Sequence, residues 1–276
     1  MKKLTGAGLY FYAIAITAFG VIQLVGQHFL LGFFPVPAGV PFRLFWLDLS
    51  SILLIGAGAG LGFRVRPDVA AVLAGCLFFV FFFLVHVPKM ITDIYNPNAW
   101  SPAFEALMLG SGAFIIADNI LKNTPVASQR WRRMAGIGAV AGIYFFALSL
   151  VVFAVLHIRY NAYIVTLIPG WMPAHLFLSY LVIAGFLLAA FSFFTNLRVP
   201  LASGMLGIMF LILIVTLNGP RAFGKWTVEV EWDSFFVALA VCGIAFSICN
   251  RAARADLWRT SDHMAVLPGL SKAGNG

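Results

Sequence analysis

Long apolar stretches alternate with short polar connections along the whole chain. A helix crosses the hydrocarbon core of a bilayer with about 20 apolar residues. The pattern therefore predicts an all-α membrane protein with eight transmembrane helices. Their expected bounds are 9–31, 42–63, 69–87, 103–121, 135–157, 174–194, 201–217 and 234–249.

The polar connections of the first half recur in the second half. Segment 86–89 (HVPK) is answered by segment 218–221 (NGPR), and Trp100 by Trp232, each 132 positions further on. Four spans in each half is an even number, so both halves insert the same way up. The repeat predicts two parallel four-helix bundles related by a pseudo-two-fold axis along the membrane normal. We expect a first repeat at 1–124, a second at 134–250, and a polar cytoplasmic tail at 251–276.

Basic residues are unevenly divided between the two sides of the predicted topology. Thirteen lie on the side of the N-terminus and five on the other, which by the positive-inside rule predicts that both termini are cytoplasmic. Lys2 and Lys3 precede the first span as in a signal peptide, but the apolar run is too long for one and no A-x-A site follows. We therefore expect a retained anchor in the cell (inner) membrane.

Composition supports a lipid environment. The chain is 62% hydrophobic and 10% charged, with a mean hydropathy of +0.96. A soluble domain of this length cannot bury so much apolar surface. The net charge of +8 sits in short clusters between spans, which indicates contact with anionic lipid headgroups and not with nucleic acid. The three cysteines form no CxxC motif and leave the compartment undetermined.

Four histidines are expected near one membrane face, on the side opposite the termini. They are His28, His86, His157 and His175. An imidazole can bind a metal or donate a hydrogen bond to a quinone carbonyl. No two of them have ligand spacing on one helix, so no metal site is predicted. The alternative is that these rings cap helix carbonyls at the interface.

Two acids lie inside apolar stretches near the same face. Asp48 and Glu105 are candidates for a proton site or a hydrogen-bond donor, because ionisable groups in spans are costly. Alternatively, Asp48 pairs with Arg43 and Glu105 complements a helix N-terminus. The second half does not repeat them, so we expect an asymmetric site in which one half carries the ionisable groups. The expected supporting residues are Trp100, Trp171, Tyr180 and Asn218.

The second and fifth spans contain small residues at close spacing. Segment 56–62 (GAGAGLG) lacks the following Lys-Ser/Thr of a nucleotide loop and sits within an apolar span. Its glycines, like Gly138 and Gly142, are expected to be packing faces where helices approach closely. Asp118 and Lys122 have the i,i+4 spacing of a local ion pair.

Two segments resemble a known family. The stretch from His86 through 96–107 (NPNAWSPAFEAL) and segment 168–177 (IPGWMPAHLF) are similar to the DoxX-like membrane proteins. The chain resembles two such four-helix units in tandem. The resemblance implies quinone-linked sulfur oxidation or a membrane oxidoreductase assembly, and it touches His86, Pro88, Trp100, Glu105, His157, Trp171, Pro173 and His175.

Three functions follow as expectations. The first is an accessory or scaffold subunit of a redox or respiratory membrane assembly, binding quinone or lipid near the outer face. The second is a small-solute or proton-coupled transporter that uses Asp48 and Glu105. The third is a purely structural subunit. No nucleophile elbow or HExxH motif supports a hydrolase, so an enzyme acting alone has the least support.

Overall fold

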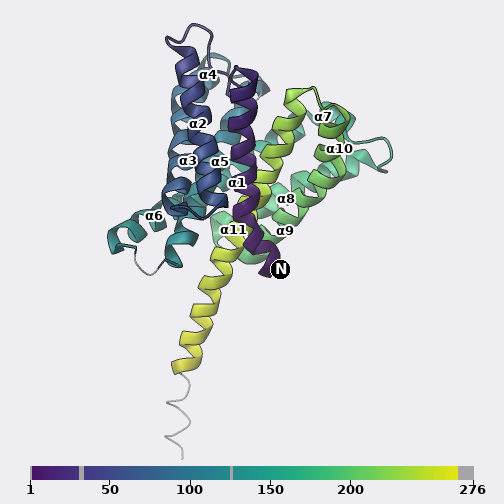
Figure 1. Cartoon of the computed structure of the whole chain (residues 1–276). Coiled ribbons are helices and arrows are strands. Elements are labelled where there is room, and N and C mark those ends of the chain that lie inside the picture. Colours follow the sequence, from purple (N-terminus) through teal and green to yellow (C-terminus); the bar gives the residue numbers. More distant parts are fainter. Residues whose placement is uncertain (1, 31–33, 125–126, 267–276) are drawn as a thin grey trace, which may run out of the picture.

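The computed structural model describes residues 2–30, 34–124 and 127–266, with the side chains of 7–30, 34–124 and 127–254. This part of the chain is helical and has no strand (Figure 1). Eight of its helical segments are long and apolar enough to cross a membrane. The chain is therefore an all-α integral membrane protein, as predicted. The helices are α1 (Lys2–Gly26), α2 (Arg43–Gly62), α3 (Pro67–Phe81), η1 (Phe82–His86), α4 (Val87–Thr92), α5 (Pro97–Lys122), α6 (Gln129–Arg159), α7 (Asn161–Leu167), α8 (His175–Thr195), α9 (Val199–Leu213), η2 (Ile214–Asn218), α10 (Gly219–Gly224) and α11 (Glu229–Val266).

The observed helices differ from the predicted spans mainly at their ends. Helix α1 stops at Gly26 and not at position 31, because Gln27 has a φ of 52° and cannot continue a right-handed helix. The last predicted span ends at position 249, whereas α11 continues as helix through the first part of the polar tail to Val266. Residues 267–276 lie outside the described residues.

The backbone repeats at the offset of 132 that the sequence predicts. A π-helical turn ends α3 and another ends α9, at η1 and η2, and each is followed by a short helix with proline at its second position. Pro88 and Pro220 lack the amide that would donate to the carbonyl four residues earlier, so the hydrogen-bond ladder must shift there. The same backbone adjustment therefore occurs in both halves, whatever the neighbouring side chains are.

Left-handed residues recur at the same offset. Each pair below marks a turn at which one helix ends or the next begins, and the two members have nearly equal positive φ values. Such a conformation costs energy for residues other than glycine, so its repetition indicates that the turn geometry itself is retained. The pairs are Phe42 and Ala174 (55° and 54°), Arg64 and Asn196 (60° and 57°), and Arg66 and Arg198 (45° and 49°).

The helices form a closed ring in the order α1, α2, α3, α5, α6, α8, α9, α11, with α5 and α11 also in contact across it. The last helix of each half packs on the first helix of the other half, so that α5 lies against α6 and α11 against α1 (Figure 1). In their most apolar stretches 78% of α5 and 67% of α11 are buried, against 33–50% for the other spans. Helices α5 and α11 are therefore the centre of one continuous bundle.

Close backbone approach holds the two halves together. A Cβ on Gly243 of α11 would lie 2.4 Å from the carbonyl oxygen of Gly8 in α1, and a Cβ on Gly142 of α6 would lie 2.8 Å from that of Ser111 in α5. Ser111 and Gly243 are repeat equivalents, 132 positions apart. Both cross-half contacts therefore use a glycine where a larger residue would separate the helices.

The predicted packing glycines of α2 divide into two kinds. A Cβ on Gly58 would meet the Thr17 hydroxyl of α1 at 2.0 Å, and one on Gly60 would meet Ala70 of α3 at 2.9 Å. Gly56 and Gly62 instead have no atom within 4 Å of an added Cβ. The packing interpretation therefore fits Gly58 and Gly60, and is wrong for Gly56 and Gly62.

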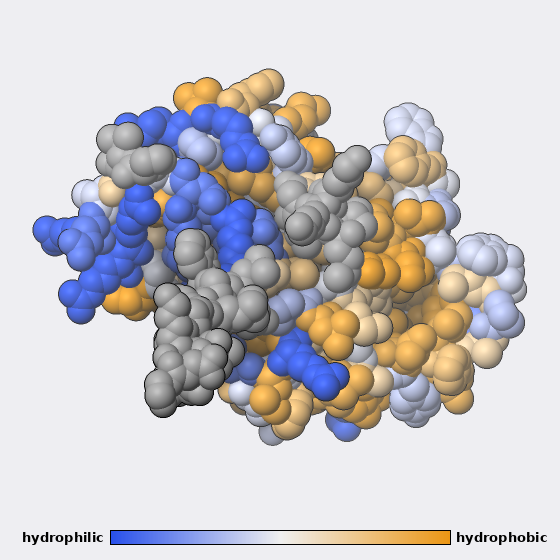
Figure 2. All heavy atoms as spheres, turned by 90° about the horizontal axis from the view of Figure 1, so that it is seen from below, coloured by the Kyte–Doolittle hydropathy of each residue, from blue (hydrophilic) through white to orange (hydrophobic). Residues whose placement is uncertain are grey.

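Polar side chains at the N-terminal end of the bundle are unevenly placed. Figure 2 looks onto this end and shows hydrophilic residues gathered on one side, while the other side is mostly apolar. Several basic residues lie at this end in the α2–α3 turn, at the end of α5 and at the start of α6. They include Arg64, Arg66, Lys122, Arg130 and Arg132. The corresponding turn between α8 and α9 carries Arg198 alone among basic residues.

Candidate functional site

A cluster of acids lies between the halves, toward the end of the bundle opposite the N-terminus, which we call the far end. Asp233 of α11 is 4% exposed, and neither of its carboxyl oxygens has a hydrogen-bond partner among the described residues. The carboxyl groups of Glu105 and Glu229 are both near enough to repel a charge on Asp233. A buried carboxyl without partners and with acidic neighbours opposes its own ionisation.

Glu105 reaches this cluster from α5. Its carboxyl accepts a hydrogen bond of 3.0 Å from the Ser101 hydroxyl one turn earlier. The two central helices are equivalent in the repeat, so Ser101 corresponds to Asp233, and Glu105 to Val237. Glu105 comes from the central helix of the first half and Asp233 from that of the second half. In the repeat alignment their positions differ by four residues, which is one helical turn.

The rim of the cluster contains a carboxyl in contact with an imidazole. Glu229, one turn before Asp233, lies 3.2 Å from Nε2 of His28. The side chains are 43% exposed for His28 and 25% for Glu229, so this contact faces the surface and contributes little stability by itself. It places His28 at the surface beside Glu229, one helical turn from Asp233.

Gln23 of α1 lies at the same level along the bundle. Helices α1 and α11 run antiparallel, and the ring contact of Phe19 with Phe236 (6.3 Å) and the ion pair of His28 with Glu229 bracket the stretch that holds Gln23 and Asp233. The Gln23 amide donates to the hydroxyls of Ser50 (2.7 Å) and Ser51 (2.9 Å) in α2 and to the Leu47 carbonyl (3.3 Å). Its own carbonyl oxygen is buried without a partner among the described residues.

This arrangement favours a bound proton. If both carboxyls were ionised, Asp233 would bear the desolvation cost of a buried charge, and the charge of the half-buried Glu105 would repel it. A proton on Asp233 removes its desolvation cost and the repulsion by Glu105, and supplies a hydrogen-bond donor. The chemistry available to the cluster is therefore the holding, donation and uptake of a proton.

Asp48 and Arg43 lie on α2 at the same end. One carboxyl oxygen of Asp48 and the Nε of Arg43 are buried without hydrogen-bond partners among the described side chains. The guanidinium of Arg43 instead lies over the Phe29 ring, 5.2 Å from its centre, and no ion pair joins it to Asp48 within the described part of the chain. The expected Arg43–Asp48 pairing is therefore wrong.

His86 ends the π-helical turn η1, which packs on α5. It is fully buried, and neither ring nitrogen has a partner in the described part of the chain. Its repeat equivalent Asn218 ends η2. An unpaired buried imidazole retains a donor and an acceptor for a ligand, and π-helical turns occur often at functional sites.

The remaining candidates of the second half have other partners or are exposed. His157 contacts the Phe153 carbonyl (3.0 Å) and stands edge-on to Phe186 of α8 (5.3 Å), while His175 contacts the Pro169 carbonyl (3.1 Å). Trp171 and Tyr180 are exposed, at 68% and 53%. The Phe153 carbonyl lies inside α6 and the Pro169 carbonyl lies in the loop before α8, so neither histidine caps the end of a helix.

Trp100 makes the same contact as its repeat equivalent. Its indole donates to the Ile94 carbonyl (2.8 Å), and Trp232 donates to the Trp226 carbonyl in the same way (2.9 Å). Both rings tie the start of a central helix to the preceding loop. Trp100 is thus a scaffold for the helix that carries Glu105.

The expectation that one half carries all ionisable groups is wrong. Asp233 and Glu229 come from the second half, and sequence reasoning did not single them out. Glu105 lies within an apolar stretch, whereas Asp233 stands just before one, where acids are common. The repeat aligns Asp233 with Ser101, which is not ionisable, and its clearest match at this point is between Trp100 and Trp232. Only the α5–α11 contact shows that these acids belong together.

A second polar network ties the central helices at the N-terminal end. Asp118 of α5 is 2% exposed and contacts both Lys122 (2.8 Å) and Nε of Arg251 in α11 (2.7 Å). The Asn119 amide donates to the Ser247 carbonyl of α11 (2.8 Å). The predicted Asp118–Lys122 pair is present, and Arg251 makes it a bridge between the halves.

Among the surface pockets formed by described residues are two that include no member of the acidic cluster. One, of about 400 Å³, lies between the loop at 166–170 and the start of α10, where Arg221 and Lys225 both pair with Glu231 (2.7 and 3.2 Å). The other lies between α2 and α3. Within the described residues no three His, Cys, Asp or Glu side chains are grouped to hold a metal ion.

The fold and the site define a class: an integral membrane protein of eight spans with buried carboxyl groups between its two halves. Comparison with protein-family models, with curated proteins and with solved structures finds no match to this chain.

Proposed function

We propose that this protein is an accessory subunit of a redox or respiratory assembly in the cell membrane, and that its Glu105–Asp233 site exchanges protons near the outer face. The observation that carries the proposal is Asp233, a carboxyl with two buried oxygens and no partner among the described residues, beside a second carboxyl. Ionisable groups inside spans are costly and mark functional sites by default. The resemblance to DoxX-like proteins supports the redox setting.

A quinone is the ligand class that this chemistry suits. Reduction of a quinone takes up protons at its carbonyl oxygens, so a binding site benefits from a protonated carboxyl or an imidazole N–H near a membrane face. His86 supplies an imidazole whose nitrogens are both unpaired in the described structure.

Rigid packing between the halves favours a subunit over a rocking carrier. Alternating access by paired repeats requires one half to move against the other. Here the contacts of Gly243 with Gly8 and of Gly142 with Ser111 join the halves through backbone atoms, and Asp118 and Arg251 add a buried ion pair. Each of these contacts would have to break in a rocking motion.

The proposal is tested by binding of a short-chain quinone to purified protein in mild detergent. We expect decylubiquinone to raise the thermal unfolding midpoint of the wild type and to have a much smaller effect on Asp233→Asn and His86→Ala. Asp93→Asn is the matched control, because Asp93 is an exposed acid at the same end of the bundle. Equal shifts in wild type, Asp233→Asn and Asp93→Asn would rule out the site.

The membrane orientation is part of the proposal. The excess of basic residues at the N-terminal end supports a cytoplasmic location for both termini. In a background whose three native cysteines are replaced, Trp171→Cys should react with a membrane-impermeant maleimide in intact cells, and Arg64→Cys should react only after the cells are opened. The reverse pattern would place the acidic cluster near the cytoplasm.

Proton-coupled transport is the second candidate, because the cluster draws one carboxyl from each half. In that case proteoliposomes should show proton movement, reported by an internal pH dye, that is abolished by Asp233→Asn. Asp48 was the other expected coupling group, and Asp48→Asn distinguishes whether it takes part. A carrier role is excluded if no solute gradient moves protons into liposomes that contain the wild type.

A further inference from the structure

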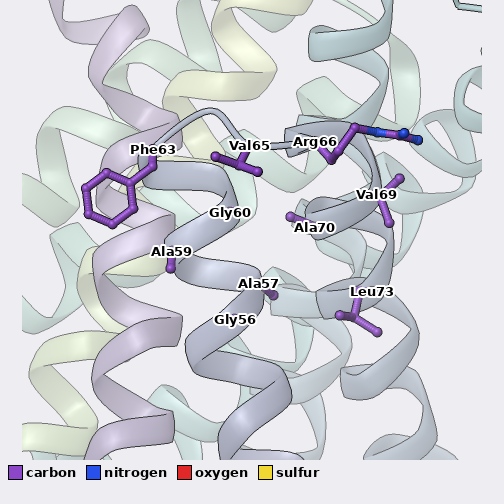
Figure 3. A pocket seen from close by; sticks show the side chains of 10 residues that line it. All are labelled: Gly56, Ala57, Ala59, Gly60, Phe63, Val65, Arg66, Val69, Ala70 and Leu73. Carbon is purple, nitrogen blue, oxygen red and sulfur yellow. The ribbon is translucent and has the colours of Figure 1, made fainter.

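A groove on the outside of the bundle lies between α2 and α3 at the N-terminal end. It has a volume of about 370 Å³ and is lined by small and apolar side chains together with one arginine (Figure 3). Figure 3 shows the floor on α2, one wall on α3 and the arginine in the connecting turn. The lining residues are Gly56, Ala57, Ala59, Gly60, Phe63, Val65, Arg66, Val69, Ala70 and Leu73.

Glycine residues, which have no side chain, create this groove on α2. Gly56 has no atom within 4 Å of an added Cβ, so its surface is open, whereas at Gly60, nearer the connecting turn, α2 touches Ala70 of α3. The rim consists of exposed apolar side chains, with Phe63 at 81% and Val65 at 66%. Such a trough on a membrane protein faces acyl chains, which are the apolar groups available at that depth.

Arg66 lies in the turn at the end of the groove, and in Figure 3 its side chain extends away from α2, past Val69, into open space. Its side chain is 78% exposed, and its only acidic neighbour among the described side chains is Asp68, at the long distance of 3.8 Å. Asp68 is also engaged by the Trp131 indole, which donates to its other oxygen at 3.1 Å. The guanidinium is therefore accessible to an anion at the membrane surface, where it can donate two parallel hydrogen bonds to a phosphate.

The second half provides an internal comparison. Arg198 stands at the repeat position of Arg66, with the same left-handed backbone. Gly56, Ala59 and Gly60 are replaced there by Leu188, Phe191 and Ser192, whose side chains occupy the corresponding face of α8. The basic residue is thus present in both halves, but only the first half has small residues at all three of these positions.

We propose that the α2–α3 groove binds an anionic phospholipid of the leaflet at the N-terminal end, with one acyl chain along Gly56 and Gly60 and the phosphate on Arg66. This site is separate from the acidic cluster and does not depend on the proposed function. The coincidence of an apolar trough with an accessible guanidinium at its surface end selects a lipid over a free anion, because a free anion makes no use of the trough.

Native mass spectrometry of the detergent-purified protein tests the site by titration with phosphatidylglycerol and phosphatidylcholine. Gly56→Leu introduces the residue of the second half into open space, and should weaken phosphatidylglycerol binding at least about tenfold by filling the groove. Arg66→Ala should weaken it about fivefold and reduce the preference over phosphatidylcholine. Ala59→Phe, which copies Phe191 of the second half, is a second groove-filling variant.

Arg198→Ala is the matched control, because it removes the equivalent charge from a surface without the trough. We expect it to change the affinity for phosphatidylglycerol less than about twofold. The proposal is overturned if Gly56→Leu and Ala59→Phe bind phosphatidylglycerol as the wild type does, or if Arg198→Ala weakens binding as much as Arg66→Ala. It is equally overturned if inorganic phosphate competes fully with the lipid, since the acyl chain would then contribute nothing.

Discussion

The two halves of the molecule share a backbone and differ in their polar side chains. The π-helical turns, the left-handed residues and the tryptophan contacts recur at an offset of 132. Glu105 and His86 have Val237 and Asn218 as their equivalents. Steric requirements of packing act equally on both copies, whereas a site between them needs its groups only once. The differences between the halves are therefore a better guide to function than the likenesses.

The largest expected effect comes from the glycine that joins the halves. Gly243→Ser puts the first half's residue into the second half, where its Cβ would lie 2.4 Å from the Gly8 carbonyl oxygen. We expect a loss of about 3 kcal/mol in the free energy of unfolding, measured in detergent with a chemical denaturant. The reciprocal change Ser111→Gly should cost about 1 kcal/mol, the helix-propensity penalty of glycine. Similar losses for both would mean that the two interfaces are packed alike.

The buried ion pair at the N-terminal end should rank second. Arg251→Met leaves Asp118, which is 3% exposed, with only the half-exposed Lys122. We expect a loss of about 2 kcal/mol from Arg251→Met and less than about 1 kcal/mol from Lys122→Met. If Lys122→Met costs as much as Arg251→Met, the pair within α5 matters more than the bridge between halves.

A smaller loss is expected where the first half has a polar network and the second does not. Gln23 donates to Ser50 and Ser51, whose repeat equivalents are Val182 and Ile183. Gln23→Leu should reduce stability by about 1 kcal/mol, because it leaves two hydroxyls without their donor. The triple change that also converts Ser50 to Val and Ser51 to Ile should recover that stability, by completing the apolar pattern of the second half. A triple variant less stable than Gln23→Leu would contradict this.

The smallest effect concerns pH. Ionisation of Asp233 or Glu105 opposes burial, so the wild type should lose stability as pH rises from mildly acidic to mildly alkaline values. Asp233→Asn removes one acid and its repulsion of the other, and should be more stable than wild type by about 1 kcal/mol at the alkaline end, with no advantage at the acidic end. Thermal midpoints across this range check the sign. An unchanged pH slope in Asp233→Asn would show that another group titrates.

The sequence was sufficient for the fold class because hydrophobic length fixes the spans. It also located the repeat, since Trp100, Trp232 and the two prolines recur at a constant offset. The ends were less predictable: α1 ends at Gly26 because one residue, Gln27, takes a left-handed conformation that no composition rule indicates. The helix order around the ring also depends on contacts between residues far apart in the chain.

The site was only half predictable. Glu105 stood out because it lies within an apolar span, whereas Asp233 near the start of α11 resembled an ordinary interfacial acid. What brings them together is the packing of α5 on α11, which sequence spacing within one helix does not reveal. The prediction for the glycines of α2 failed in part for the same reason, because Gly58 faces α1 while Gly56 faces outward.

Infrared spectroscopy of the protein in lipid measures the protonation of buried carboxyls most directly. The carbonyl stretch of a protonated carboxyl should be present at neutral pH in the wild type, in a frequency range free of amide bands, and should decrease in both Asp233→Asn and Glu105→Gln but not in Asp93→Asn. A wild-type spectrum without this band at neutral pH, or one that neither substitution alters, would contradict a shared proton between the two halves.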